Sequence, residues 1–502
     1  MTRVMPAALW LASWVGGAQA GQLPDPYGGS GFEEAHGIVT TRHSVELNGR
    51  TLAYTARAGH IPIRVNDTGA VHATMFFIAY TLDRTAATAS RPLTFLWNGG
   101  PGSSSSLVHL IGFGPKRLDD DGVAVANDGT WLESSDLVFV DPIGTGYSRP
   151  TEATYAAEFY QNRGDAESVA EFIRVYVTRA EAWDAPIFLA GESFGVSRAV
   201  RVAGVLQRIA MPVSGLMLIG LVPPLAQIDA VTRTALAVPT YAAAALYHRE
   251  QASERSRRLE ARTAEAAAWA QSTYAPALAR RAELTQTERD AIRDRLAGFI
   301  GIPHTSIDST LTVRMDRFTH ELLGDRGLVV GRYDTRLTGP VDPQQQMYDP
   351  TRDPSLRGII DDVAVVRYMR NQLRFLSDLR YQGPFGGGYP PPTSFRGDWM
   401  SVLWNRDDIG SLQFSTTDGV PELQRLLRAD GDLHVYTACG WYDLVCSQAV
   451  IEHMANTLDP ELARRVVVRD YAGGHAIYTD PAARRQMRDD VSTFIRQAVP
   501  RR

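Results

Sequence analysis

A serine within the segment Gly-Glu-Ser-Phe-Gly, residues 191–195, is the side chain of this sequence best suited to act as a nucleophile. The segment follows a short apolar run at 187–190 and precedes a helix-like stretch at 196–209. A serine on such a sharp strand-to-helix turn is exposed, and only small residues fit two positions before and after it. The following helix N-terminus favours developing negative charge. The pattern predicts that Ser193 attacks a carbonyl carbon, whereas an ordinary strand-to-helix turn is the structural alternative.

A neutral serine hydroxyl needs a base, and the chain offers one histidine and one aspartate in suitable places. His475 follows a strand-like run at 465–469 and a glycine-rich loop, and Asp443 follows another strand-like run at 433–436. The order serine, aspartate, histidine is that of the α/β-hydrolases. We therefore expect His475 to accept the serine proton and Asp443 to orient the imidazole.

Attack on a carbonyl creates an oxyanion, which needs backbone donors aimed at it in advance. The segment Trp-Asn-Gly-Gly-Pro-Gly at 97–102 follows an early apolar run and brings backbone close to a substrate. Gly100 is the better donor there, because Pro101 has no N–H group. Phe194, directly after the nucleophile, supplies the second N–H group. The alternative, a phosphate-binding loop, lacks the G-x-x-x-x-G-K-[ST] pattern.

The elements that must position these residues show two kinds of pattern. Residues 38–82 alternate apolar and polar side chains, which predicts antiparallel strands. Short continuous apolar runs follow, typical of buried parallel strands, with a helical pattern at 166–182 between two of them. These runs lie at 93–97, 137–140, 187–190, 216–219, 433–436 and 466–468. Strand alternating with helix predicts an α/β fold with a central, mostly parallel sheet.

The middle of the chain differs in composition from the parts on either side. Residues 229–300 are rich in Ala, Arg and Glu, which predicts several helices. We interpret residues 222–430 as a mostly helical cap insertion, and residues 21–221 and 431–502 as the two parts of the catalytic core. The chain of 502 residues is long enough for this arrangement.

The N-terminus and the composition bear on localisation and partners. Arg3, an apolar stretch at 7–15 and small residues at Ala18 and Ala20 predict an export signal at 1–20; a buried helix is the alternative. No later run reaches the roughly 20 apolar residues of a membrane helix. We therefore expect a periplasmic or secreted protein without stable membrane insertion.

The net charge of −5 gives no support for nucleic-acid binding, no motif predicts a cofactor or metal, and the oligomeric state stays open.

Together these segments resemble the serine carboxypeptidases, peptidase family S10. The resemblance is spread from about residue 70 to the C-terminus, and the middle third matches poorly. It rests on residues 97–102, 114–115, Asn127 with Trp131, 141–148, 191–195 and the segments around Asp443 and His475.

The resemblance implies an α/β-hydrolase that releases C-terminal residues from peptides through an acyl-enzyme. It also implies that Asn98, Gly99 and Glu192 bind the terminal carboxylate of the substrate. Two carboxyl groups at hydrogen-bonding distance cannot both be ionised, so Glu192 has to be protonated. We therefore expect the best activity on peptides at acidic pH.

Two departures from the family pattern matter. A family glutamate that partners Glu192 is replaced by Gly112, so the carboxylate-binding set is incomplete. An esterase or acyltransferase with the same triad is therefore the main alternative, and a non-catalytic binding protein is a third. The second departure is Ser103, where the family usually has a cysteine, so one family disulfide is absent. The two cysteines of the chain, Cys439 and Cys446, are neither paired nor separated by the sequence alone. The family pattern slightly favours a pocket thiol at Cys446 over a disulfide.

Overall fold

The computed structural model describes residues 37–47, 49–83, 90–342, 352–384 and 420–499. The expected export signal at 1–20 lies outside these ranges. Within them, no helix is both long and apolar enough to cross a membrane.

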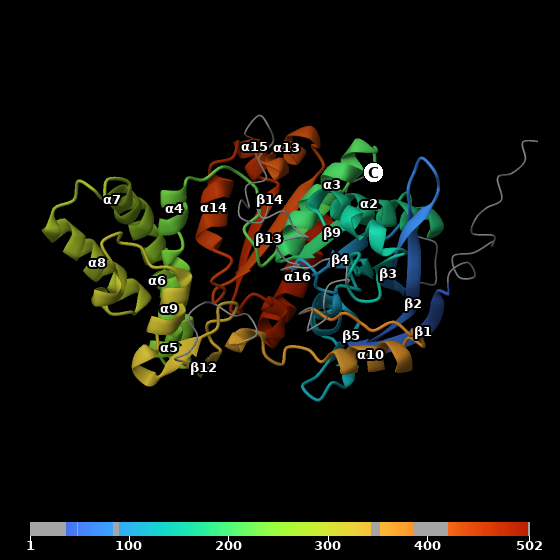
Figure 1. Ribbon diagram of the computed structural model, residues 1–502, viewed down its shortest axis with the longest axis horizontal. Coiled ribbons are helices and arrows are strands. Elements are labelled where there is room, and N and C mark those ends of the chain that lie inside the picture. The colour runs from blue at the N-terminus through green and yellow to red at the C-terminus, as the bar shows by residue number, and fades with distance from the viewer. Residues whose placement is uncertain (1–36, 48, 84–89, 343–351, 385–419, 500–502) are drawn as a thin grey trace, which may run out of the picture.

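A ten-stranded sheet runs through the centre of the molecule (Figure 1), in the order β1-β2-β3-β7-β4-β9-β10-β13-β14, with β8 paired to β3. Every pairing from β7 to β14 along this order is parallel, whereas β1, β2, β3 and β8 form antiparallel pairs, and β3 joins β7 antiparallel. The antiparallel strands are β1 (Val39–Leu47), β2 (Arg50–Arg64), β3 (Val71–Leu82) and β8 (Arg149–Pro150). The parallel strands are β4 (Leu93–Trp97), β7 (Asp136–Val140), β9 (Ile187–Glu192), β10 (Gly215–Ile219), β13 (His434–Gly440) and β14 (Val466–Tyr471).

Two apolar cores lie on the two faces of this sheet. Side chains of β9 alternate between them: Ile187 and Leu189 join one core, and Phe188 and Ala190 join the other. Helices α2 and α3 pack on the first face, and α16 packs on the second. Their bounds are α2 (Asn162–Arg179), α3 (Phe194–Arg208) and α16 (Pro481–Ala498). The predicted fold class, an α/β-hydrolase core with a mostly parallel sheet, is confirmed.

Shorter elements complete the core around the strand ends. They are η1 (Val108–Phe113), β5 (Lys116–Leu118), β6 (Ala124–Ala126), η2 (Ala153–Tyr155), α1 (Ala156–Phe159), α13 (Glu422–Ala429), α14 (Gln448–Asn456), α15 (Pro460–Ala463) and η8 (Ile477–Thr479). Because η1 and η8 lie in the loops after β4 and β14, they bring irregular backbone to the edge where the parallel strands end.

The chain between β10 and β13 divides into two structural parts. Helices α4 to α9 gather at one end of the molecule, beyond α14 (Figure 1), around an apolar core of their own. Helix α10 instead joins the core of the sheet, where the Tyr368 hydroxyl lies 2.9 Å from that of Tyr80. The elements are α4 (Ala230–Ala235), α5 (Val238–Arg249), α6 (Ala252–Trp269), η3 (Ala270–Tyr274), α7 (Ala275–Ala279), α8 (Gln286–Ile300), η4 (His304–Ser306), α9 (Met315–Glu321), η5 (Gly324–Arg326), β11 (Leu328–Val330), β12 (Thr338–Pro340), η7 (Pro354–Leu356) and α10 (Asp362–Asn371).

Candidate active site

Ser193 stands on a sharp turn between β9 and α3. Its backbone has φ +55° and ψ −129°, a conformation that residues other than glycine rarely adopt. A Cβ atom at Gly191 would come 2.0 Å from the carbonyl oxygen of Gly195, so the turn admits no larger residue there. The backbone N–H of Ser193 donates to the carbonyl of Ile219 at 2.8 Å, which ties the turn to β10. The strained turn places Ser193 in the lining of the pocket, as a nucleophile on such a turn requires.

His475 and Asp443 meet although 32 residues separate them in the chain. His475 Nδ1 lies 2.7 Å from Asp443 Oδ2, and Asp443 Oδ1 accepts the backbone N–H of Val445 at 2.8 Å. Asp443 is fully buried. Burial alone lowers the pKa of His475, but the neighbouring Asp443 carboxylate raises this pKa above its ordinary value overall. Asp443 therefore holds the ring in one orientation and favours the proton that the ring would accept.

His475 lines the same pocket as Ser193. His475 Nε2 is buried and makes no hydrogen bond to any described residue. The backbone N–H of His475 donates to the carbonyl of Tyr333 at 2.6 Å, and the Tyr333 ring meets the imidazole edge-on. A Cβ at Gly220 would come 3.2 Å from the imidazole, so both neighbours restrict the ring.

The candidate oxyanion donors come from the turn after β4 and from the start of α3. A Cβ built on Gly99 would lie 2.4 Å from the backbone nitrogen of Phe194, so the two segments are in close contact. Gly100 has φ +100°, which a residue with a side chain adopts only at a cost. The structure therefore brings the backbone around Gly100 next to Phe194, as an oxyanion site requires.

Asn98 and Glu192 form a buried pair beside the serine. The Asn98 side-chain amide donates to Glu192 Oε2, while Asn98 Oδ1 accepts the backbone N–H of Val108 at 3.1 Å. The Val108 contact fixes which end of the amide faces the glutamate. Burial raises the pKa of Glu192 above its ordinary value, against the opposing effect of His475. A protonated Glu192 is thus favoured at higher pH than for a glutamate in water.

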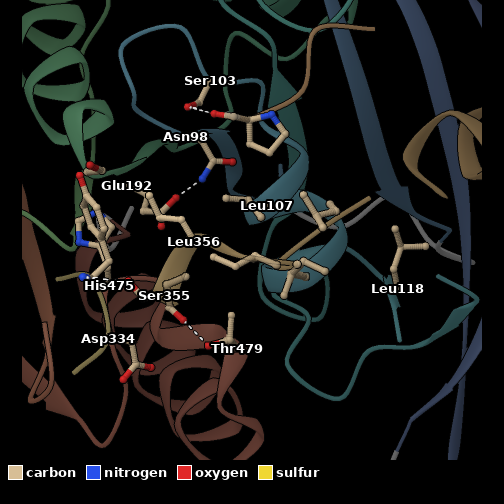
Figure 2. A pocket seen from close by; sticks show the side chains of 18 of the residues that line it. Asn98, Ser103, Leu107, Leu118, Glu192, Asp334, Ser355, Leu356, His475 and Thr479 are labelled. Atoms are coloured by element: carbon tan, nitrogen blue, oxygen red, sulfur yellow. Dashed lines mark hydrogen bonds between the residues drawn. The ribbon is translucent and has the colours of Figure 1, made fainter. Parts of the chain in front are cut away.

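A pocket of about 630 Å³ opens over these residues. Figure 2 shows Glu192 between Asn98 and His475, with Leu356 and Leu107 near them and Leu118 on the far side. Predicted site residues that line it are Asn98, Gly99, Gly100, Glu192, Ser193 and His475. Asp443 lies behind His475, and Phe194 is present at the site through its backbone. All eight predicted residues are thus brought to one place.

The sequence-based reasoning missed the pocket wall. It comes largely from residues 333–337 and 355–364, where Leu337, Leu356 and Ile359 face the cavity. The Asp334 side chain also lines it and pairs with Arg336, with 2.7 Å between Asp334 Oδ2 and the guanidinium. These segments are mostly irregular, so no hydrophobic periodicity marks them in the sequence.

The slight preference for a pocket thiol at Cys446 is wrong. Cys439 and Cys446 form a disulfide, and their Cα atoms lie 5.7 Å apart, within the usual range for such bonds. Both residues are buried. The disulfide closes the loop that carries Asp443, so it constrains the residue that orients His475. Within the described ranges, no group of three or more His, Cys, Asp or Glu side chains could hold a metal ion.

Known proteins with similar sequences indicate which family this chain resembles. A family model described as "Serine carboxypeptidase" matches residues 48–209. The pheromone-processing carboxypeptidase KEX1 of Saccharomyces cerevisiae is 40% identical over 95 residues, which are 18% of this chain and 13% of that protein. The KEX1 protein of Candida glabrata is 31% identical over 195 residues, which are 38% of this chain and 24% of that protein. The matched segments therefore span less than a quarter of the length of these relatives.

One solved structure shares the fold over nearly the whole chain. The crystal structure of the prohormone-processing carboxypeptidase Kex1(Δ)p from Saccharomyces cerevisiae superposes with a TM-score of 0.53 at 16% identity. The superposition covers 88% of this chain and 91% of that one. The segment matched by the family model contains Ser193, Asn98 and both candidate oxyanion donors. Through residues 48–209 this chain is similar to the serine carboxypeptidases, and it shares the fold of one solved carboxypeptidase.

Proposed function

We propose that this protein is a serine-type carboxypeptidase that releases C-terminal residues from peptides through an acyl-enzyme. The observation that carries the proposal is the position of the Asn98–Glu192 pair, which lines the same pocket as Ser193 and His475. Glu192 precedes the nucleophile directly, so whatever it binds lies next to the scissile bond. A buried, protonated carboxyl beside an amide suits a free carboxylate, because the two carboxyl groups then share one proton.

Acylation uses the triad and the backbone donors. The Ser193 hydroxyl oxygen bonds to the carbonyl carbon of the last peptide bond, and its proton passes to His475 Nε2. The N–H groups of Gly100 and Phe194 stabilise the oxyanion. His475 then gives its proton to the leaving nitrogen, the C–N bond breaks, and the C-terminal amino acid departs.

Deacylation repeats these steps with water. A water oxygen bonds to the acyl carbon while His475 takes one of the water protons, and the proton then returns to the Ser193 oxygen as the ester bond breaks. Asp443 stays ionised throughout and stabilises the imidazolium that forms twice in each cycle.

An esterase or acyltransferase with the same triad is the second candidate, and Gly112 is the observation that favours it. Gly112 places no acid beside Glu192, so the pair lacks the second carboxyl that the family resemblance leads us to expect. An acyltransferase would pass the acyl group to an alcohol or amine, with the same histidine as base.

The deciding experiment uses a series of N-terminally blocked peptides with free or amidated C-termini. Wild-type protein and Ser193→Ala are incubated with each peptide, and mass spectrometry follows the products. We expect stepwise loss of single residues from free C-termini only, and no loss with Ser193→Ala. Wild-type hydrolysis of simple esters without any peptide cleavage would instead support the esterase or acyltransferase.

Localisation and domain organisation belong to the same proposal. Export after cleavage behind Ala20 is supported by the buried Cys439–Cys446 disulfide, since such bonds persist in oxidising compartments. A cap function for residues 222–430 is supported by the part of this region that lines the pocket. Mass spectrometry of the protein recovered from periplasm and medium should find Gly21 at the N-terminus; retention of residues 1–20 in the cytoplasm would contradict export.

A further inference from the structure

Tyr478 in η8 fills the space beside Gly112. A Cβ built on Gly112 would lie 3.4 Å from Tyr478 Cγ and 3.5 Å from Cδ1, so it fits, but a longer side chain would meet the ring. Tyr478 is completely buried, and its ring packs edge-on against Phe113 with centroids 5.1 Å apart. Because Gly112 has no side chain, the space beside it is free for the ring of Tyr478.

The hydroxyl of Tyr478 lies close to the candidate carboxylate-binding pair, Asn98 and Glu192, near enough to affect the pKa of the glutamate. The oxygen is buried and has no hydrogen bond of good geometry to any residue in the described ranges. Burial, followed by the nearby Glu192, raises the pKa of Tyr478 well above its ordinary value, so the hydroxyl keeps its proton and remains a donor.

A buried hydroxyl without a partner is costly and calls for an explanation. Glu192 offers one, because its carboxyl changes protonation and hydrogen bonding when a second carboxylate approaches. The groups that face Glu192 are the Asn98 amide, the His475 imidazole and the Tyr478 hydroxyl, with Asp443 contributing from behind His475. Among these, the Tyr478 hydroxyl is an uncharged donor without a well-formed hydrogen bond to any residue that the structure describes.

We infer that Tyr478 is a positioning residue for substrate-carboxylate binding, whose hydroxyl donates to Glu192 from the core side and replaces an acidic side chain at position 112. Tyr478 does not line the pocket and so acts through Glu192 rather than on the substrate. The inference rests on the proposed carboxypeptidase function and deepens it. It also explains how Asn98 and Glu192 are held in place although residue 112 is not acidic.

Two effects of removing the hydroxyl follow. Tyr478→Phe keeps the ring over Gly112 but removes a donor that stabilises the ionised form of Glu192, so the pKa of Glu192 rises. Glu192 also loses a contact that orients it toward the substrate. The alkaline limb of peptide cleavage should therefore move to higher pH, and the preference for free over amidated C-termini should fall about tenfold, mostly through KM.

The experiment measures kcat and KM across pH for one blocked peptide as its free acid, its amide and its methyl ester. Wild type, Tyr478→Phe and Gly112→Ala are compared, and Gly112→Ala serves as the matched packing control because a Cβ fits there. We expect Tyr478→Phe to show both effects while its turnover of the ester stays within about twofold of wild type. Gly112→Ala should behave like wild type.

The inference would be overturned if Tyr478→Phe kept the wild-type preference for free acids and its activity declined at the same alkaline pH as that of wild type. The double variant Gly112→Glu/Tyr478→Ala adds an independent measurement, since it places an acid where the ring was removed. It should prefer free acids more strongly than Tyr478→Ala alone, and equal preference would also count against the inference. Wild type without any preference for free acids would instead refute the proposed function itself.

Discussion

Two parts of the pocket lining are built in different ways. In the catalytic part, Ser193, His475 and Asn98 follow strands β9, β14 and β4, and specific partners hold the side chains of His475 and Asn98. In the apolar wall, Leu356 and Ile359 come from irregular chain between β10 and β13. The catalytic part depends on atoms in fixed positions, whereas the apolar wall depends on shape and apolar area.

This difference predicts how each part tolerates change. Loss of one polar partner in the catalytic part leaves another buried polar group unpaired, which is costly for both chemistry and stability. Loss of a few methyl groups in the apolar wall changes only how well a side chain fits.

Asp443→Asn should have the largest effect on turnover. Asparagine can no longer favour the imidazolium or hold the required tautomer of His475, so we expect kcat to fall on the order of 10⁴-fold. Asp334→Asn is a matched control, because Asp334 also borders the pocket but pairs with Arg336. The control should lose less than about tenfold in kcat. Similar losses in both variants would show that the triad geometry is not what drives turnover.

Arg198→Ala should have the largest effect on stability. Arg198 Nε lies 2.6 Å from Asp165 Oδ2, both side chains are buried, and a second guanidinium nitrogen donates to the Asn98 carbonyl at 2.9 Å. Removing the guanidinium leaves Asp165 buried without its partner, so the free energy of unfolding should fall by about 3–5 kcal/mol.

Arg163→Ala provides the control for this measurement. Its ion pair with Glu167 is exposed and spaced i, i+4, so solvent screening leaves it only a small contribution to stability. Urea denaturation of both variants gives the comparison. Equal, small losses would mean that the buried pair does not support the Asn98 loop.

Glu192→Gln should change the pH dependence of peptide cleavage. Burial raises the pKa of Glu192, so wild type keeps the protonated form to higher pH than an exposed glutamate, and kcat/KM for free-acid peptides falls once the group ionises. Glutamine does not ionise, so the variant should lose this alkaline limb while keeping the acid limb of His475. Its kcat/KM below the limb should drop about tenfold, because an amide is the weaker donor to a carboxylate.

An ester substrate without a free carboxylate serves as the internal control for these profiles. Its kcat/KM should rise as His475 loses its proton and then stay level in both proteins. A peptide profile that rises steadily to pH 9 in wild type would contradict a role for protonated Glu192.

Leu356→Ala should have the smallest effect. The side chain lines the apolar wall of the pocket and is half-buried. Its truncation should raise KM for peptides with bulky C-terminal residues about three- to tenfold and leave kcat nearly unchanged. Leu376→Ala, whose side chain is 71% exposed and outside the pocket, should leave both constants unchanged. A large loss of kcat in Leu356→Ala would remove the contrast between the catalytic part and the apolar wall.

Much of the catalytic part could be predicted because local rules govern it. A strand buried on both faces reads as a continuous apolar run, and β4 matches its predicted bounds of 93–97. A nucleophile turn needs small residues at 191 and 195, so its pattern is visible within five positions. Parallel strands end at one edge of the sheet, so Ser193, Asp443 and His475 were expected together on the basis of strand order alone.

Contacts between distant, irregular segments were decided by the tertiary structure. The wall at 355–364 carries no periodic pattern, and the Cys439–Cys446 pairing depended on how the Asp443 loop folds back. The meeting of Tyr478 with Gly112 joins positions 366 residues apart in the chain. The candidate nucleophile, the chain order of its candidate partners and the sheet could be predicted from the sequence, since periodicity and turn chemistry are local. Only the packed chain determined what faces Glu192, because burial and side-chain direction depend on all of the elements around it.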